Sequence, residues 1–189
     1  MKIVAGLGNV GNKYCNTKHN FGFWVIDEFV INRSLKYKAG KGNYIFSKDG
    51  KLICLKPTTY MNNSGLALLE AKQYFDIDIN NILIVYDDID LPLGSLRFRT
   101  SGGSGGHRGL ESIIYQLKTE NISRLKIGIA TQEIMRPSEK YVLSPFNKKY
   151  AKKKNEMIDK ACDGINYYLT HSINETMNKF NKNEKGING

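Results

Sequence analysis

Short apolar runs alternate with segments of helical spacing along this chain, and this alternation constrains the fold more than any other feature. A short apolar run bounded by turn residues is typical of a buried strand. Such runs lie at about residues 2–7, 43–47, 51–56, 81–87, 95–100 and 124–130, with a hairpin expected at Asp49-Gly50. Strands that alternate with helices predict a single α/β domain, whose twisted, mixed sheet is flanked by helices.

The expected helices are segments whose apolar residues recur at the spacing of one helix face. The first follows His19, the second begins near Asn63 or Ser64, the third includes residues 110–117, and a long fourth begins near Pro145. On the second helix, the apolar positions expected to face the core are Leu66, Leu68, Leu69 and Tyr74.

The pattern indicates one domain without a membrane anchor. No repeat or linker interrupts residues 1–180, and the polar residues 181–189 are expected to form a disordered tail. No apolar stretch approaches the roughly 20 residues that span a bilayer, and the N-terminal run is too short for a signal peptide. Because Cys15, Cys54 and Cys162 form no C-x-x-C pair, neither a disulfide framework nor a zinc site is indicated. We therefore expect a cytoplasmic protein with reduced thiols.

Residues 6–11, at the end of the first expected strand, match the dinucleotide-binding pattern G-x-G-x-x-G. That motif needs a helix directly after the glycines and an acidic residue at the end of a second strand. Here the polar segment 12–20 follows instead, and the acidic residue is missing. The glycines therefore indicate a turn, with Asn9 and His19 on loops around one strand end, and this pairing suits hydrolysis better than hydride transfer.

The charge of the chain is strongly positive. Lys and Arg number 28 against 18 Asp and Glu, which gives a net charge of +10. Such an excess attracts polyanions, and nucleic acid is the first partner to consider. Lysine outnumbers arginine 22 to 6, however, and a biased composition would produce the same charge without such a partner. The charge by itself leaves both interpretations open.

Asp87 is the first charged residue after the apolar run 82–86. A buried carboxylate needs a partner, because breaking a buried ion pair costs about 3–5 kcal/mol. An imidazole N–H would be suitable, and the bond would fix the tautomer of a histidine base. The residues equally allow Asp87, Asp88 and Asp90 to form a solvated turn.

Histidines and asparagines near the expected strand ends offer further candidates. His19 and His107 lie in such loops, whereas His171 lies beyond the long helix and is expected at the surface. Asn9 and Asn62 can donate and accept hydrogen bonds without charge, as suits a carbonyl or a developing oxyanion. A capping or core role for His19 and turn formation by the asparagines remain open alternatives.

A glycine-rich loop at residues 102–106 matches G-x-S-x-G, the nucleophile elbow of serine hydrolases. The elbow should follow a buried apolar strand, but the preceding run alternates with arginines, so Ser104 is expected to be a loop residue. The loop and the next helix N-terminus could instead face an anion. The cations expected around it are Arg97, Arg99, Arg108, Arg124 and Lys126, and a second cluster, equally consistent with a solvated helix face, is formed by Lys148, Lys149, Lys152, Lys153 and Lys154.

Taken together, these segments resemble the bacterial-type peptidyl-tRNA hydrolases. The resemblance covers nearly the whole chain, through ordered motifs at residues 3–9, 18–22, 56–65, 86–94, 105–110 and 124–129. Two positions depart from the family pattern. Val10 stands where the family commonly has proline, and Arg108 stands where it commonly has asparagine.

The resemblance implies an enzyme that hydrolyses the ester between a peptide and the 3′-terminal ribose of tRNA, without metal or cofactor. On that basis His19 matches the base that activates water and Asp87 the carboxylate that orients it. Asn9 and Asn62 match amides that position the substrate and stabilise the tetrahedral intermediate. The other residues expected at the substrate are Tyr14, Tyr60, Met61, His107 and Arg108, and those expected to bind tRNA phosphate are Arg99 and Lys126.

Peptidyl-tRNA is accordingly the expected partner, and the basic single domain suggests a monomer. Such an enzyme would recycle tRNA from prematurely released peptidyl-tRNA, and its tRNA affinity should fall steeply with salt. Three other functions are alternatives: a non-catalytic RNA-binding module on the same fold, a nicotinamide-dependent enzyme and a serine esterase that uses Ser104. The joint presence of His19, Asp87, Asn9 and Asn62 favours the peptidyl-tRNA hydrolase.

Overall fold

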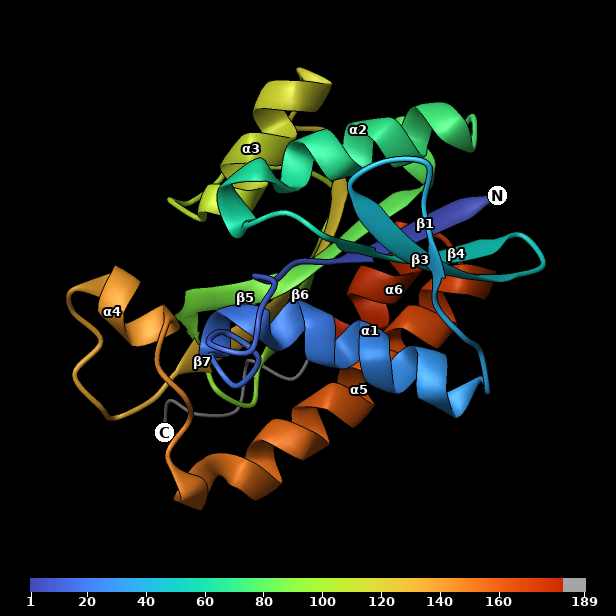
Figure 1. Ribbon diagram of the computed structural model, residues 1–189. Helices are drawn as coiled ribbons and strands as arrows, with labels where there is room; N and C mark the ends of the chain where they lie inside the picture. Colours follow the sequence, from blue (N-terminus) through green and yellow to red (C-terminus); the bar gives the residue numbers. More distant parts are fainter. Residues whose placement is uncertain (182–189) are drawn as a thin grey trace.

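A mixed sheet of seven strands forms the centre of the computed structural model, which describes residues 1–181 (Figure 1). The strand order is β2-β3-β4-β1-β5-β7-β6. The four central strands β4, β1, β5 and β7 are parallel, whereas the pairs β2–β3, β3–β4 and β6–β7 are antiparallel. The strands are β1 Lys2–Gly6, β2 Lys38–Ala39, β3 Tyr44–Asp49, β4 Leu52–Pro57, β5 Ile82–Pro92, β6 Leu96–Arg99 and β7 Ser123–Ala130. The predicted α/β class with a mixed sheet is confirmed.

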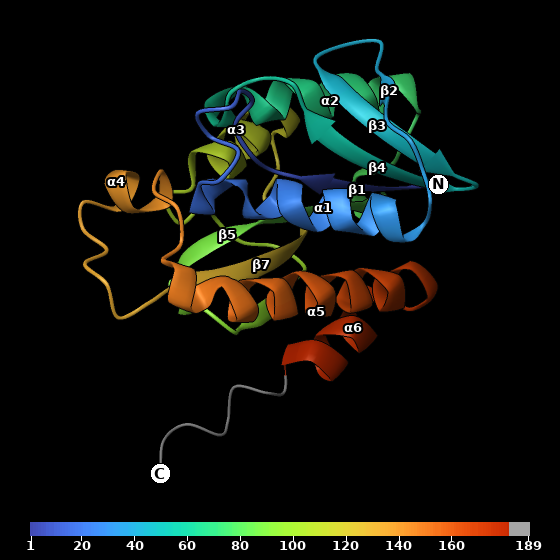
Figure 2. The ribbon, with the colours of Figure 1, turned by 60° about the horizontal axis from the view of Figure 1, so that its bottom comes forward.

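Helices cover both faces of this sheet. The α-helices are α1 Phe21–Asn32, α2 Ser64–Tyr74, α3 Arg108–Leu117, α4 Ser138–Val142, α5 Ala151–Thr170 and α6 Ile173–Phe180. Short 3₁₀ helices occupy Lys18–Asn20, Met61–Asn63, Ile79–Asn81 and Lys148–Tyr150. Figure 2 shows α1, α5 and α6 on one face and α2 and α3 on the other, with α4 beside the end of β5.

The central strand β5 explains why the sheet is buried on both sides. Leu83 and Val85 face the core formed with α1 and α5, whereas Ile84 and Tyr86 face the core formed with α2 and α3. Because alternate side chains enter two different cores, the strand appears in the sequence as a continuous apolar run. The polar residues that follow this run therefore lie at the edge where both layers meet.

Two details of the expected helices are wrong. Helix α2 buries Ala67, Leu68 and Ala71, whereas Leu66 and Tyr74 are exposed, because small residues let α2 pack closely on the sheet and on α3. The long helix α5 begins at Ala151, after a 3₁₀ turn, rather than near Pro145. The sequence analysis also did not predict α4 or α6, although Ser172 and Glu175 form a capping box at the start of α6.

The C-terminal residues of the described chain cover the outer edge of the sheet. Helix α6 packs on β6, and the Asn181 side chain bonds both the N–H and the C=O of Phe98. Asn181 is the first residue of the expected tail and is anchored by these bonds, while the expected disorder of residues 182–189 concerns a segment outside the described residues. Within residues 1–181, none of the helices has the length and apolar character needed to span a membrane.

Candidate active site

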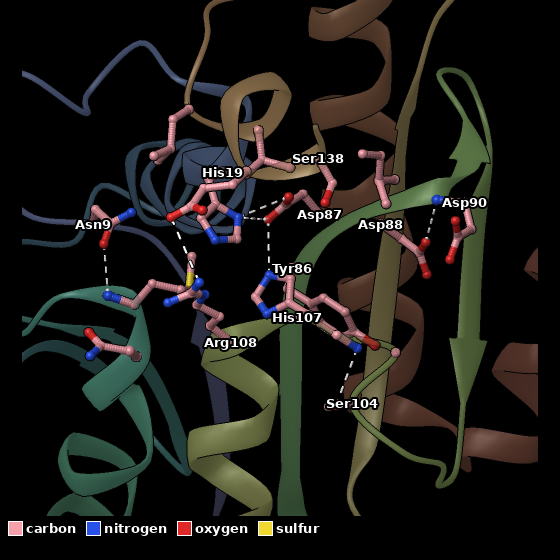
Figure 3. A pocket seen from close by; sticks show the side chains of 18 of the residues that line it. Asn9, His19, Tyr86, Asp87, Asp88, Asp90, Ser104, His107, Arg108 and Ser138 are labelled. Carbon is pink, nitrogen blue, oxygen red and sulfur yellow. Dashed lines mark hydrogen bonds and ion pairs between the residues drawn. The ribbon is translucent and has the colours of Figure 1, made fainter. Parts of the chain in front are cut away.

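A pocket of about 630 Å³ opens where β1 and β5 end, at the edge of the sheet where α/β folds place ligands (Figure 3). Ten of the eleven site residues predicted from the sequence line it. Those ten are Asn9, Tyr14, His19, Tyr60, Met61, Asn62, Asp87, His107, Arg108 and Lys126. The eleventh, Arg99, lies on β6 and is not part of the pocket wall.

Asp87 and His19 form the centre of this pocket. The Nδ1 atom of His19 lies 3.0 Å from both carboxylate oxygens of Asp87, and the Asp87 side chain is 2% exposed. His19 belongs to the 3₁₀ turn that leads into α1, whereas Asp87 follows the buried part of β5. Within residues 1–181, no hydrogen bond engages His19 Nε2, so the Nδ1–H tautomer leaves a basic nitrogen for a ligand.

His107 is a second imidazole on the same carboxylate. Its Nε2 lies 3.1 Å from Asp87 Oδ1, and its Nδ1 accepts the N–H of Leu110 at the start of α3. Because a backbone donor occupies Nδ1, the neutral ring carries its proton on Nε2 and donates it to Asp87. Asp87 therefore accepts hydrogen bonds from two histidines that lie on different layers of the fold.

These contacts set the protonation of the pair. Burial alone would raise the pKa of Asp87, but the charge and hydrogen bonds of His19 and His107 hold that pKa well below its usual range. Burial likewise opposes charge on His19, yet the Asp87 carboxylate outweighs it and raises the pKa of His19 above 6.5, while Arg108 lowers it. Asp87 is thus a permanent anion that strengthens His19 as a base.

The same three side chains are close enough to ligate a metal ion, with donor atoms within 4.8 Å of one another. The hydrogen bonds of these side chains are unfavourable for metal binding. His107 Nε2 carries the hydrogen that it donates to Asp87, because Leu110 N–H occupies the other nitrogen. A metal would have to displace the bonds that Asp87 accepts from both rings, so the donor set fits a hydrogen-bonded base better than a metal centre.

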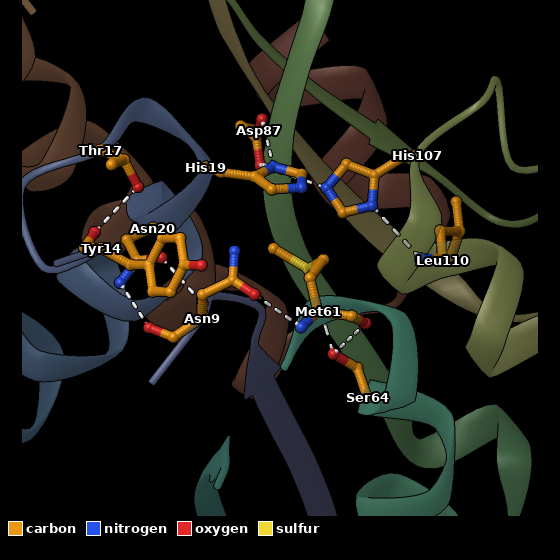
Figure 4. Close-up of polar contacts among 10 residues, drawn as sticks. All are labelled: Asn9, Tyr14, Thr17, His19, Asn20, Met61, Ser64, Asp87, His107 and Leu110. Carbon is orange, nitrogen blue, oxygen red and sulfur yellow. Dashed lines mark hydrogen bonds and ion pairs between the residues drawn. The ribbon is translucent and has the colours of Figure 1, made fainter. Parts of the chain in front are cut away.

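Asn9 presents an oriented amide to the pocket (Figure 4). Its Oδ1 accepts the Met61 N–H at 2.8 Å, which leaves the NH₂ group as the end able to donate to a ligand. Its backbone is clamped by Asn20, whose side chain accepts from Asn9 N–H and donates to Asn9 C=O. Asn20 is a positioning residue that was not predicted from the sequence, although it lies beside His19 in the family motif at residues 18–22.

The first two glycines of the G-x-G-x-x-G pattern, Gly6 and Gly8, pack against α1, whereas Gly11 is exposed in a turn with a φ of 98°. A Cβ on Gly6 would come within 2.3 Å of the Gly22 carbonyl oxygen, and one on Gly8 within 2.6 Å of the Phe23 ring. No helix starts at these glycines, because a turn and a 3₁₀ segment precede α1. The predicted absence of a dinucleotide-type helix start is confirmed.

An aromatic pair stands at the rim near Asn9. Tyr14 and Tyr60 meet edge to face, with ring centroids 6.1 Å apart, and Tyr60 is exposed. Met61 is a buried residue of the same pocket wall, and Asn62 is exposed on the same 3₁₀ turn. These side chains offer aromatic faces and an amide, which suit a nucleoside or a peptide.

Helix α4 forms the opposite wall, and the sequence did not predict it. Arg108 reaches across to Glu139 of α4, with an Nη2–Oε1 distance of 3.8 Å between two largely exposed side chains. The wall is tied to the histidine turn by Lys18, a buried ammonium that donates to Ser144 Oγ and to the Pro145 carbonyl. Burial lowers the pKa of Lys18.

The expected cations divide into three groups. Arg124 was expected near an anion, but it is 1% exposed and donates to three backbone carbonyls, so that expectation is wrong. Lys126 lies in the pocket and pairs with Asp88, while Arg97 and Arg99 lie on β6 opposite Lys126 and Arg124. The lysine cluster of residues 148–154 does not line the pocket.

Ser104 lies in the pocket wall without the features of a nucleophile elbow. Its Oγ lies 3.3 Å from the N–H of Gly106, and a loop, rather than a sharp strand-to-helix turn, joins β6 to α3. Within residues 1–181, no histidine ring is hydrogen-bonded to Ser104 Oγ, and the one bond from a histidine joins the His107 backbone N–H to the Ser104 carbonyl. The prediction that it is a loop residue is confirmed.

Comparison with known proteins agrees with this geometry. The family description "Peptidyl-tRNA hydrolase" matches residues 3–187. The peptidyl-tRNA hydrolase of a Sulfurihydrogenibium species is 44% identical to this chain, over 97% of this chain and 98% of that protein. The peptidyl-tRNA hydrolase of Mesomycoplasma hyopneumoniae strain J is 39% identical, over 99% of this chain and 100% of that protein. The crystal structure of the Acinetobacter baumannii enzyme superposes with a TM-score of 0.87 at 30% identity, over 96% of this chain and 95% of that one. The chain therefore belongs to the peptidyl-tRNA hydrolase family.

Proposed function

We propose that this chain hydrolyses the ester between the peptide and the 3′-terminal ribose of peptidyl-tRNA, through water activated by His19. The observation that carries the proposal is the Asp87 bond to His19 Nδ1, which leaves Nε2 directed to a ligand. An activated water suffices for an ester, and one positioned base contributes about 10²–10⁴-fold. The basic charge of the chain suits an anionic substrate.

In the first step, His19 Nε2 removes a proton from water as the water oxygen attacks the ester carbonyl. The carbonyl electrons move to its oxygen, and the Asn9 NH₂ group is placed to donate to this oxyanion, because Met61 N–H occupies the amide oxygen. Asp87 stabilises the imidazolium that forms on His19. The tetrahedral intermediate then expels the ribose 3′-oxygen, which takes the proton from His19.

The remaining predicted residues receive positioning roles in this proposal. His107 holds Asp87 from the α3 side, and Asn62 offers a second amide at the rim. Tyr14 and Tyr60 provide the surface on which the 3′-terminal nucleoside rests. Lys126 and Arg99, on the adjoining strands, bind tRNA phosphate, and recycling of tRNA is the resulting cellular role.

The test is release of acyl-amino acid from N-acyl-aminoacyl-tRNA by the wild type and by His19→Ala. We expect turnover by the wild type and a loss of about 10²–10⁴-fold in the variant. His171→Ala is the matched control, because His171 stacks on Tyr167 at the end of α5 and does not line the pocket.

Three outcomes would contradict this assignment. A wild type that binds tRNA without turnover would be an RNA-binding module on the same fold. Retained activity in His19→Ala would refute the base, and loss confined to Ser104→Ala would identify a serine esterase instead.

A further inference from the structure

A second ion pair lies beside the histidine cluster, on the next residue of β5. Lys126 Nζ is 2.5 Å from Asp88 Oδ2, and the two side chains are 29% and 9% exposed. The Asp88 carboxylate is held in place, because its other oxygen accepts the Asp90 N–H at 2.8 Å. Charge-assisted bonds of this kind are strong, and partial burial reduces their screening by salt.

Lys126 belongs to a row of cations on one face of the sheet. Arg97 lies directly opposite it in the antiparallel pairing of β6 and β7, and Arg99 follows two residues later on β6. Residues opposite one another, or two apart on a strand, share a face. An anion that approaches this row meets Lys126 with a carboxylate already bound to it.

We propose that Asp88 weakens tRNA binding by serving as an internal counter-ion of Lys126, which a tRNA phosphate has to displace. The inference rests on the proposed function and deepens it, because it assigns a role to a residue outside the catalytic set. An enzyme that must release deacylated tRNA benefits from a phosphate site that holds its product loosely. Asp88 acts through Lys126 and is an affinity-setting residue.

The test measures binding of deacylated tRNA, the product, by fluorescence anisotropy across a series of KCl concentrations. Each phosphate contact adds about 0.7–0.9 to the slope of log K against log salt. Asp88→Asn should therefore steepen the slope by about 1 and tighten binding about tenfold at low salt. Asp88→Ala is a second variant that removes the same charge, and it should steepen the slope to the same extent even if the asparagine of the first variant disturbs the strand.

Two controls separate the ion pair from a general change of charge. Asp90→Asn removes the same charge two residues further along the chain. Asp90 bonds Asp88 only through its backbone N–H, which the substitution keeps, so the slope should stay unchanged. In a Lys126→Gln background, Asp88→Asn should no longer steepen the slope.

An unchanged slope in both Asp88 variants would overturn the inference. Equal steepening in Asp90→Asn, or steepening that persists in the Lys126→Gln background, would overturn it as well. A wild type that neither binds tRNA nor releases acyl-amino acid would instead overturn the proposed function, and the role of Asp88 with it.

Discussion

Asp87 and Asp88 are adjacent in β5, yet they lie in different environments. Asp87 accepts hydrogen bonds from His19 and His107 and is almost fully buried. Asp88 pairs with Lys126 at the side of the same pocket. Because successive side chains of a strand point to opposite faces, one carboxylate continues the row of Val85 and the other that of Tyr86.

The difference shows that partners, and not residue type, determine what each acid does. Both imidazoles donate hydrogen bonds to Asp87, one through His19 Nδ1 and one through His107 Nε2, so Asp87 orients a base. The lysine beside Asp88 is a permanent cation, so that carboxylate cancels a charge. The first arrangement favours catalysis and the second adjusts binding.

The largest effect is expected when Asp87 loses its charge. In Asp87→Asn, the amide can hold His19 in the wrong tautomer, so kcat should fall by about 10²–10⁴-fold. Single-turnover hydrolysis of N-acyl-aminoacyl-tRNA would measure this. If Asp87→Asn and Asp88→Asn lowered kcat equally, the distinction between the two acids would be lost.

The pH dependence sharpens the same contrast. His19 has to be neutral to accept a proton, so kcat/KM should rise with pH through its pKa, which lies above 6.5 because of Asp87. Asp87→Asn removes the group that raises this pKa, and the rising limb of the profile should therefore move to lower pH. A limb that stayed in place in that variant would exclude His19 as the titrating base.

A smaller loss of kcat is expected when Asp87 retains its bond to His19 but loses its second hydrogen-bond donor, His107. His107→Asn removes a hydrogen bond whose net value is about 0.5–1.5 kcal/mol, so kcat should fall by about tenfold or less. Steady-state kinetics, with the thermal midpoint of the variant measured alongside, would test this. A loss as large as that of Asp87→Asn would give His107 a direct part in the chemistry.

The smallest effect is expected at Arg108, across the pocket from α4. Arg108 lowers the pKa of His19, so Arg108→Asn should move the rising limb of the pH profile slightly to higher pH. The shift is small because the guanidinium is 66% exposed and screened by water. Arg136→Asn, which removes another arginine of the pocket wall, is the control and should leave the midpoint unchanged.

Much of the site could be predicted because its residues lie directly after predicted strands. Asn9 follows β1, Asp87 lies at the point where the apolar part of β5 ends, and His107 precedes α3. Parallel strands that end at one edge bring such residues together whatever lies between them. The bond between His19 and Asp87, which are 68 residues apart, follows from that topology.

Other parts of the site could not be predicted, because they depend on contacts between distant segments. Helix α4 has only five residues, too few to show a helical pattern in the sequence. It is held in place through Ser144, just after the helix, which bonds Lys18, 126 residues away in the sequence. Arg124 has the same sequence signature as a phosphate ligand, and only its three carbonyl acceptors reveal a buried structural role.

The sequence by itself determined the α/β class, the expected strands, the resemblance to the family and the residues that gather at one sheet edge. These follow from periodicity and from motifs, which are local properties of the chain. The tertiary structure decided which nitrogen of His107 carries the proton, which end of the Asn9 amide can reach a ligand, and that Asp88 binds Lys126. Each of these depends on a hydrogen-bond or ionic partner supplied by another segment of the chain, and such a partner exists only in the folded protein.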